Sequence, residues 1–533
     1  MVNLINLFID KFRGIRAVNP VVDVVETGVM SALECKNVEL KYSRNGNNVG
    51  IYTMKGNRVI AELLPAKEIR GMWESIQQSV RHTVVYATDD NGGYLYEYKA
   101  STQSFELLRE GLTKTKTCNG KTIAQGLEDF FIFTNGVDDY LAVNFNAELE
   151  EDKVKELNAV DAESRQIRGL ALEYYDGRLV TICKNRVHWS QQGNIFDWSA
   201  ATTGLITNAA YQEFDRDVKA IIYYNNTLVA FTESYSVCFT GNPAGSDFVR
   251  SGSTGGGCAN FMSVLRFDNK LFYYDHFARN VFAYYLYDSG QTRPTDGLAN
   301  DIKKYFDMID TTRIDEISVQ GFTVEDRTEV WFKLPINYTE TLVMILDYLK
   351  NEWVIRDVSG LNAMMLYDNG IYTATGNKIY REYLSNTFNG EFRPCEYLMN
   401  IINVGSDSNL KIPKLPIIFT FDSKYMNNFY IEFTYDDKPD KKKLKKISKG
   451  ADKFLIWCAD ENDPDGGYWA EDENDELGGV WGRDDSLNVT YSLAGTLPFK
   501  QLQMRIFTQD LNDEFGIKRI EMKKVKIKTK TVM

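Results

Sequence analysis

The sequence is poor in the residues that build metal sites and disulfide frameworks. It contains three histidines and seven cysteines in 533 residues. The cysteines are odd in number, widely scattered and never arranged as a CxxC pair, so neither a zinc knuckle nor a disulfide framework is indicated. They are Cys35, Cys118, Cys183, Cys238, Cys258, Cys395 and Cys458. We expect reduced thiols in a protein made in a cytoplasm, and we expect no cofactor.

Long apolar runs are also missing. No stretch of about 18 consecutive apolar residues occurs, which argues against a transmembrane helix. The amino-terminal segment MVNLINLFIDKF is apolar but is interrupted by Asn3, Asn6 and Asp10. Because it lacks a basic start, a continuous apolar region and a small-residue cleavage site, we expect no signal peptide.

Positive charge is in deficit, with a formal net charge of −13. Duplex nucleic acid is bound through a basic footprint, which such a chain lacks as a whole. An acidic protein can still stand beside DNA and repel it.

Proline is scarce, with 11 residues, whereas the chain holds 31 Tyr, 30 Phe and 8 Trp. Tyrosine-rich and β-branched segments favour half-buried pleated surfaces, so we expect mostly β structure. Helix signals are few. One is the stretch 298–310, where apolar residues at helical spacing predict a short helix; they are Ile302, Tyr305, Phe306 and Ile309.

Pairs of short strand-like runs, joined by polar turns, recur about every 40 to 50 residues between positions 70 and 385. The pairs are 83–88 with 94–98, 129–134 with 140–145, 178–183 with 186–190, 227–232 with 236–240, 270–275 with 280–287, 329–334 with 341–348, and 370–374 with 378–383. This spacing predicts an all-β protein with a β-propeller of about six or seven blades and an additional C-terminal β-rich domain.

One copy of this repeat, GRLVTICKNRVHWSQQGNIFDWS at 177–199, shows the pattern most clearly. Two strands joined by a tight turn are followed by an aromatic anchor. We expect core positions at Val187, Trp189, Phe196 and Trp198. Alternation places Arg186 and His188 on the opposite face, toward solvent or a neighbour.

Three regions follow from the texture of the chain. Residues 1–70 read as a strand-bearing lead-in or docking segment, 71–385 as the propeller and 386–533 as a smaller β-rich domain. Prolines punctuate the sequence after residue 390, at Pro394, Pro413 and Pro416. We expect the last region to pack with the lead-in, because chain ends often lie close together.

An acidic, glycine-rich stretch at 460–485 follows a basic run at 438–449. Within it, ENDPDGGYW at 461–469 is echoed by ENDELGGVW at 473–481. Clustered carboxylates on glycine turns could hold calcium, although the spacing is not that of an EF-hand loop. Two solvated hairpin tips are the alternative. The calcium candidates are Asp463, Asp465 and Asp475.

Aromatic residues in the same stretch are candidates for an interface, since exposed aromatics often mark one. They are Tyr468, Trp469 and Trp481. The basic run is expected to be a solvated loop or to meet an acidic neighbour in the next subunit, and the 460–485 stretch of an adjacent copy suits that role.

No catalytic site is predicted. A Ser-His-Asp arrangement needs a histidine base with an acidic orienter, and nothing near His82, His188 or His276 resembles a nucleophile elbow. A sialidase box of the form S-x-D-x-G-x-x-W is not matched at 190–198, because Gln192 stands in the place of the aspartate and Gly193 comes one position early. We therefore expect a protein that is not an enzyme.

Three blocks, in this order, resemble the β-propeller tail nozzle or hub proteins of short-tailed bacteriophages, the family also called packaged DNA stabilisation proteins. The first is Phe12-Arg13-Gly14 with ECKNV at 34–38 and the turns at 50–58. The second is the 177–198 repeat. The third is LDY at 346–348 with EWVIRD at 352–357. The resemblance covers about residues 12 to 385, and the acidic insert departs from it.

This resemblance implies a structural virion protein in the phage tail, assembled in the host cytoplasm. It would form a homo-oligomeric ring, commonly of six subunits, below the portal and adaptor proteins, and would dock other tail or fibre proteins. The ring would extend the channel, retain packaged DNA and conduct it during ejection without binding it specifically. Two alternatives stay open: a glycan-binding or glycan-processing propeller with an aromatic funnel, and a propeller scaffold for protein partners.

Overall fold

The computed structural model divides the chain into two compact units. The first unit comprises Met1–Lys55, Glu352–Ile355 and Asn386–Met533, and the second comprises Gly56–Asn351 and Arg356–Ser385. The structure describes the chain except residues 1–3, 17–20, 24–27, 44–47, 127, 162, 200–207, 244–247, 253–255, 287–291, 295, 325–326, 359, 404–408, 423–427, 439, 449–467, 470–477, 480–487, 494–496, 512 and 529–533.

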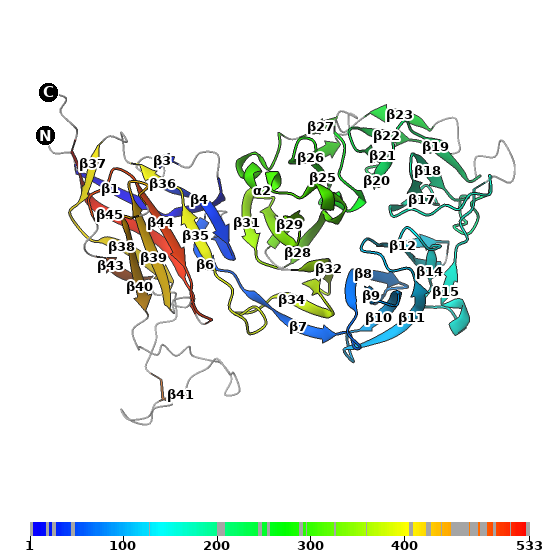
Figure 1. The fold of residues 1–533 in the computed structure, drawn as a ribbon, viewed down its shortest axis with the longest axis horizontal. Coiled ribbons are helices and arrows are strands. Elements are labelled where there is room, and N and C mark those ends of the chain that lie inside the picture. The colour runs from blue at the N-terminus through cyan, green and yellow to red at the C-terminus, as the bar shows by residue number, and fades with distance from the viewer. Residues whose placement is uncertain are drawn as a thin grey trace. The chain divides into compact units, whose positions relative to one another are not determined.

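The second unit is a propeller of seven sheets that follow one another around a ring (Figure 1). The first five sheets have four antiparallel strands each. Their strands are β8 Glu68–Gln77, β9 Val80–Thr88, β10 Gly93–Lys99, β11 Ser104–Leu112; β12 Asn119–Gln125, β13 Glu128–Thr134, β14 Leu141–Val143, β15 Val154–Glu156; β16 Leu172–Tyr175, β17 Arg178–Cys183, β18 Arg186–Trp189, β19 Ala210–Glu213; β20 Val218–Tyr224, β21 Thr227–Thr232, β22 Ser236–Thr240, β23 Val249–Gly252; and β24 Val264–Phe267, β25 Lys270–Asp275, β26 Asn280–Leu286, β27 Thr292–Pro294.

The last two sheets bring together distant parts of the sequence. The sixth contains β28 Ser318–Val324, β29 Arg327–Ile336 and β30 Glu340–Asp347, and β31 Glu352–Arg356 is the next strand in the chain. The seventh has the order β32 Leu361–Tyr367, β33 Gly370–Thr375, β34 Lys378–Ser385 and β7 Gly56–Glu62. The predicted all-β propeller is thus confirmed, with seven blades.

The first strand of each blade lies nearest the ring axis. These strands contact one another in a closed cycle, from β8 through β12, β16, β20, β24, β28 and β32 back to β8. The two middle strands of each blade are the most deeply buried, as in β21, where every side chain is buried. They read as apolar runs because blades pack against both of their faces.

A recurrent two-residue turn joins the first and second strands of five blades. Both residues of this turn have positive φ, which matches the type I′ turn that connects twisted antiparallel strands. Asn, Asp and Gly tolerate this conformation best. Four of the pairs consist of these residues, namely Asp176-Gly177, Asn225-Asn226, Asp268-Asn269 and Asp368-Asn369, and the fifth is Gln78-Ser79.

Strand β7 closes the ring. It pairs in antiparallel fashion with β34, so that residues before the first blade complete the last one. The boundary between the units therefore falls at Lys55-Gly56, whereas the sequence texture placed the end of the lead-in at residue 70. A strand that completes a blade from the other end of the sequence carries no local signal of that role.

A fully buried ion pair lies beside this closure. Arg356 and Glu382 both have side-chain exposures of 0%. The Arg356 Nε atom donates to Glu382 Oε2 at 2.9 Å, and Asn57 Nδ2 of β7 donates to the other carboxylate oxygen at 3.1 Å. Thr373 also donates its hydroxyl to that oxygen, at 2.5 Å. The carboxylate is therefore hydrogen-bonded on both oxygens, as a buried charge requires.

Aromatic side chains connect this ion pair to the sixth blade. The Arg356 guanidinium lies 4.5 Å from the centre of the Tyr383 ring. The Tyr383 hydroxyl donates to Glu329 Oε2 at 2.9 Å, and the Trp331 indole donates to the same oxygen at 2.8 Å. Burial raises the pKa of Tyr383 well above its ordinary value, so that its hydroxyl remains a donor.

Polar side chains join other neighbouring blades in a similar way. Glu173 on β16 accepts from the Tyr223 backbone amide of β20 at 3.0 Å, and it pairs with the Lys121 ammonium of β12. One carboxylate thus connects three successive blades. Gln77 at the end of β8 makes two bonds to the second blade, to the Val143 carbonyl at 2.9 Å and from the Phe145 amide at 2.8 Å.

The 177–199 repeat forms strands β17 and β18 of the third blade. Val187, Trp189 and Trp198 are buried as expected. Phe196 was expected in the core but is 37% exposed, and its ring packs edge-on against Phe130 with centroids 5.7 Å apart. Of the two aromatic residues that follow the strand pair, only Trp198 is buried in the core.

His188 also differs from expectation. It was expected to face solvent or a neighbour, but its side chain is buried, because the fourth strand, β19, covers β18 and places Tyr211 against the imidazole at 5.4 Å. Burial lowers the pKa of His188 to about 4. Arg186 stacks on the same Tyr211 ring, with its guanidinium 4.2 Å from the centroid.

The first unit contains two further sheets that combine both ends of the sequence. One holds β1 Leu4–Ile9, β5 Val38–Tyr42, β6 Asn48–Thr53, β37 Leu410–Pro413, β38 Ile417–Asp422, β43 Asn488–Leu493 and β45 Gly516–Lys528. The other holds β2 Lys11–Ile15, β3 Val21–Asp23, β4 Val29–Lys36, β35 Glu396–Met399, β36 Ile401–Asn403, β39 Asn428–Tyr435, β40 Lys442–Ser448 and β44 Leu502–Phe507. Aromatic contacts join them, such as Phe421 with Phe429 at 5.2 Å.

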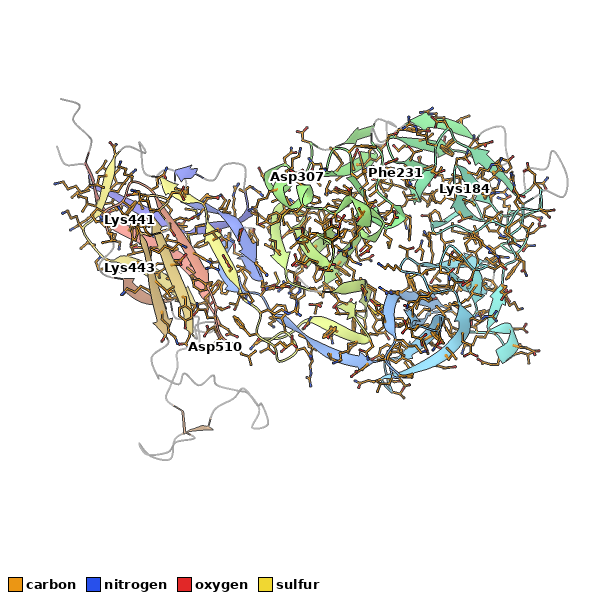
Figure 2. The ribbon with its side chains drawn as sticks, viewed as in Figure 1. Lys184, Phe231, Asp307, Lys441, Lys443 and Asp510 are labelled. Atoms are coloured by element: carbon orange, nitrogen blue, oxygen red, sulfur yellow. The ribbon has the colours of Figure 1, made fainter. Side chains whose placement is uncertain are left out.

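Part of the basic run, expected to be a loop, is strand β40. It pairs with β39 and with no other strand among the described residues. Most of its side chains are exposed or half-buried, and Figure 2 labels Lys441 and Lys443 in this region. Lysines on an unpaired edge discourage the addition of another strand.

The helix predicted at 298–310 is present as a 3-10 turn, Asn300–Ile302, followed by the short helix α2, Lys303–Asp307. Its apolar residues Ile302, Tyr305 and Phe306 are buried. Within the described ranges, no helix has the length and apolar character needed to span a membrane. The six described cysteines are free thiols, and Cys458 lies outside the described residues.

The buried ion pair gives a prediction about stability. Replacing Glu382 by Ala leaves a buried, unpaired guanidinium, so we expect the free energy of unfolding to fall by about 3 to 5 kcal/mol in chemical denaturation. The double variant Arg356→Met/Glu382→Leu should recover most of this loss, because it leaves no unpaired charge. The control is Lys442→Ala, which removes an exposed pair with Glu432 and should cost less than about 1 kcal/mol. Equal losses of stability in Glu382→Ala and Lys442→Ala would contradict the role of the buried ion pair.

The buried imidazole of His188 gives a second prediction. Between pH 6.5 and about 4 the unfolded chain binds a proton at this residue and the folded chain does not. Stability should therefore fall as the pH falls through this window, by about 3 kcal/mol from this residue. We expect His188→Phe to lose this share of the pH dependence, measured as unfolding free energy at pH 7 and pH 4.5. Parallel pH profiles for the variant and the native chain would show that His188 does not contribute.

Candidate functional site

The residues singled out in the acidic stretch fall largely outside the described part of the chain. Asp463, Asp465, Asp475 and Trp481 are among the residues that the structure does not describe. The two-residue strand β41, Tyr468–Trp469, pairs in parallel with β42, Gly478–Gly479. Among the described residues, no group of three or more His, Cys, Asp or Glu side chains is placed to hold a metal ion. The calcium and interface assignments stay predictions.

A different site is formed by the segments that lead into the first strand of each blade. Two adjoining cavities, of about 450 Å³ and 750 Å³, share Lys116, Thr117, Arg313 and Glu316 in their walls. Their other walls come from all seven blades, which places them at the ring axis. We call the two cavities together the funnel. Lys184, labelled in Figure 2, lies in the wall of the larger one.

Charged side chains dominate the funnel, and most of them are positive. Seven basic residues face four acidic ones, in a chain whose net charge is −13. The basic residues are Arg70, Lys116, Arg168, Lys184, Lys219, Arg313 and Lys333, and the acidic ones are Glu68, Asp217, Asp315 and Glu316. The funnel thus has the opposite sign to the protein as a whole.

Arg313 is held firmly in the wall shared by the two cavities. Its guanidinium donates to both oxygens of Glu316, at 2.6 and 3.2 Å. It also donates to the backbone carbonyls of Asn337 and Glu340, each at 3.1 Å. Hydrogen bonding from Arg313 lowers the pKa of Glu316, so both groups are charged at neutral pH.

Arg70 on β8 has a similar arrangement on the wall of the smaller cavity. It pairs with Glu68 on the same strand, and its Nε atom donates to the Thr88 hydroxyl at 3.4 Å. The Asn362 amide, which begins the seventh blade, donates to the other Glu68 oxygen at 3.1 Å. These contacts fix the positions of the two charges across the junction of the first and last blades.

Lys333 is the most unusual residue of the funnel. It lies on β29 within an otherwise apolar, buried run, and its side chain is only 9% exposed. Its ammonium makes a single recorded hydrogen bond, to the Asn362 carbonyl at 3.3 Å. Burial lowers the pKa of Lys333 to about 8, with nearby Arg313 and Arg70 acting in the same direction and Glu316 opposing them.

The exposed rim of the larger cavity adds further positive charge. The Lys116 side chain is 74% exposed and lies 3.8 Å from Glu316. Lys184 and Lys219 lie on the third and fourth blades, and neither has an ion pair with any described residue. Such a wall attracts anions and repels cations.

None of the funnel residues was singled out from the sequence. They are scattered over segments far apart in the chain, and only ring closure brings them together. One signal was present: a lysine inside the strand EVWFKLPI has no place in a purely structural core. The arginines gave no such signal, because each lies in an ordinary polar segment.

The low pKa of Lys333 leads to a third prediction. Below pH 8 the folded chain must keep a buried ammonium, whereas the unfolded chain keeps its charge in water up to about pH 10.5. We expect Lys333→Met to raise the free energy of unfolding at pH 7 by about 1 to 3 kcal/mol. This gain should shrink as the pH rises from 8 to 10.5, because the native chain is then relieved of its buried charge. A loss of stability at pH 7 would contradict this description, and Lys219→Met, a half-buried funnel lysine, is the matched control.

Comparisons with known proteins do not assign a family to this chain. No family model matches it, and no curated protein matches its sequence. Among solved structures, a chain of the crystal structure of the mitotic checkpoint complex is similar over 61% of this chain and 93% of its own length. The sequence identity is 9% and the TM-score is 0.35, which is too low to carry a functional argument.

Proposed function

We propose that this protein is a structural subunit of a phage tail, a nozzle or hub ring that extends the portal and adaptor channel. In this proposal it is not an enzyme, resides in the virion after assembly in the host cytoplasm, and docks portal, adaptor and other tail or fibre proteins. The proposal rests on the resemblance of three sequence blocks to such proteins. One structural observation supports it: two of those blocks pack against each other in the first unit.

The contact joins residues more than 300 positions apart. The Gly14 amide of the Phe12-Arg13-Gly14 block donates to Glu352 Oε2 at 2.7 Å. A Cβ atom on Gly14 would come within 2.4 Å of the Trp353 carbonyl oxygen, so only glycine fits. The motif residues are therefore used for one packing arrangement, in which the Trp353 side chain is fully buried.

The second part of the same block meets the same strand. Lys36 of the ECKNV segment pairs in parallel with Ile355 of β31, and the Asn37 amide donates to the Ile355 carbonyl at 2.8 Å. Asn37 Nδ2 then donates to the Pro394 carbonyl at 3.0 Å. Short blocks that recur together in a family are expected to form one structural unit, and these do.

The physical chemistry suits a conduit for DNA. The chain passes between its two units at four points, at residues 55–56, 351–352, 355–356 and 385–386, so the propeller is not joined to the rest of the chain by a single linker. An acidic surface repels phosphates and lets DNA slide without sticking.

The alternative of a glycan-binding propeller relied on an aromatic funnel, but the funnel walls hold eleven charged side chains and two aromatic ones, Tyr338 and Phe261.

The proposal predicts a ring. Six copies of the 61.0 kDa chain would give a particle of roughly a third of a megadalton. Size-exclusion chromatography with light scattering should find this mass, and negative-stain electron microscopy should show rings with a central channel. Gly14→Val should reduce ring formation more than Gly252→Val, where the added side chain meets open space. A stable 61.0 kDa monomer that binds or hydrolyses sugars would overturn the proposal.

A further inference from the structure

We propose that the funnel of the propeller is a binding site for a small phosphate monoester, with Lys333, Arg70 and Arg313 at its inner end. This inference rests on the geometry of the funnel and not on the proposed tail function. A protein that forms rings but does not bind phosphate would contradict this inference and not the tail function. A protein that binds phosphate but does not form rings would contradict the tail function and not this inference.

The first argument is the environment of the Lys333 ammonium. A protonated lysine has three N–H donors, and the structure records one bond, a 3.3 Å contact to the neutral Asn362 carbonyl. A buried ammonium with so few partners is costly unless an anion completes its environment. The adjoining 450 Å³ cavity has room for such an anion.

The second argument is that the neighbouring cations are already fixed in place. Arg313 is held by Glu316 and by two carbonyls, and Arg70 is held by Glu68. Their side chains lose little freedom when a ligand arrives, which favours binding. Arginine and lysine together are the usual partners of phosphate oxygens.

The third argument is the local charge. The smaller cavity is lined by Arg70, Lys116, Arg313 and Lys333 against Glu68 and Glu316, which leaves a net charge of +2 with Lys333 protonated. A dianion such as a phosphate monoester neutralises this set, whereas a single carboxylate does not. The volume exceeds that of the phosphate group alone and suits a small organic substituent.

The fourth argument concerns the entrance. Lys116, which is 74% exposed, lies in the wall that the two cavities share, and Lys219 lines the larger one. Positive charge at the mouth of a cavity raises the local concentration of anions and speeds their entry. A net acidic protein gains more from such a local field than a basic one, since the rest of its surface repels the ligand.

Ligand binding should be coupled to a proton. The charged or titratable groups facing Lys333 are Glu316 and Arg313 before β28, Arg70 on β8 and Cys118 before β12. An added dianion favours the ammonium form of Lys333, so binding above pH 8 should take up a proton from solution. Structural water in the same cavity would produce no such uptake.

The test uses the full chain with two probes, inorganic phosphate and glycerol 3-phosphate, at constant ionic strength set with chloride. Isothermal titration calorimetry at pH 7 should show binding of both, with the monoester tighter. Lys333→Met should weaken binding about tenfold or more, as expected for the loss of a buried charge-assisted bond. Lys116→Ala, at the exposed rim, should weaken it about two- to fivefold.

Proton uptake is measured by repeating the titration at pH 9 in two buffers with different ionisation enthalpies. The native chain should take up protons and Lys333→Met should not. The control, Lys446→Met on β40, should match the native chain in every measurement. Equal affinity of Lys333→Met and the native chain, or no binding of either probe at millimolar concentration, would overturn the proposal.

Discussion

The propeller depends on the pairing of β7 with β34. Without it the seventh blade would expose the edge of β34. The joint between the last and first blades would then rest on the contacts of β32 and β33 with β8 and on hydrogen bonds such as that from the Ile69 amide to the Gly376 carbonyl, at 2.8 Å. The Arg356–Glu382 pair and Asn57 lie on this same joint. Because β7 comes from the start of the propeller sequence and β34 from its end, closure requires the whole unit to be in place.

The propeller buries charge in two contrasting ways. Glu382 is neutralised by a fully buried arginine and is hydrogen-bonded on both oxygens, so its charge needs no further partner. Lys333 is buried almost as deeply, yet its recorded partner is one neutral carbonyl. The first arrangement specifies a unique packing of the blades. The second costs stability that the fold does not recover, which is the usual mark of a residue retained for a ligand.

Much of the propeller could be predicted from the sequence. The strands that could be predicted are the buried ones. The seven predicted strand pairs correspond to the two middle strands of the seven blades, such as β17 with β18 and β21 with β22. These strands are buried on both faces and read as apolar runs. Outer strands such as β11 and β23 are largely exposed, so their residues resemble those of loops.

Long-range features could not be predicted from the sequence, for a different reason. The role of β7, the burial of His188 under β19 and the gathering of cations in the funnel each depend on which segments meet in space. Two weaker signals were available in the residues themselves: the recurrent Asx-Asx or Asx-Gly pairs that begin at 176, 225, 268 and 368, and the lone lysine of β29. Both signals are local: the pairs mark turns between the first and second strands of a blade, and the lysine marks the wall of the funnel.

Native-state hydrogen exchange, followed by mass spectrometry, tests the closure most directly. If β7 completes the seventh blade, its amides should exchange as slowly as those of the middle strands β21 and β33, through global unfolding of the propeller unit. Glu382→Ala should accelerate exchange in β7 and β34 before it affects β21. Rapid exchange of β7 in the native chain, with β33 and β34 still protected, would show that the ring is not closed by this strand.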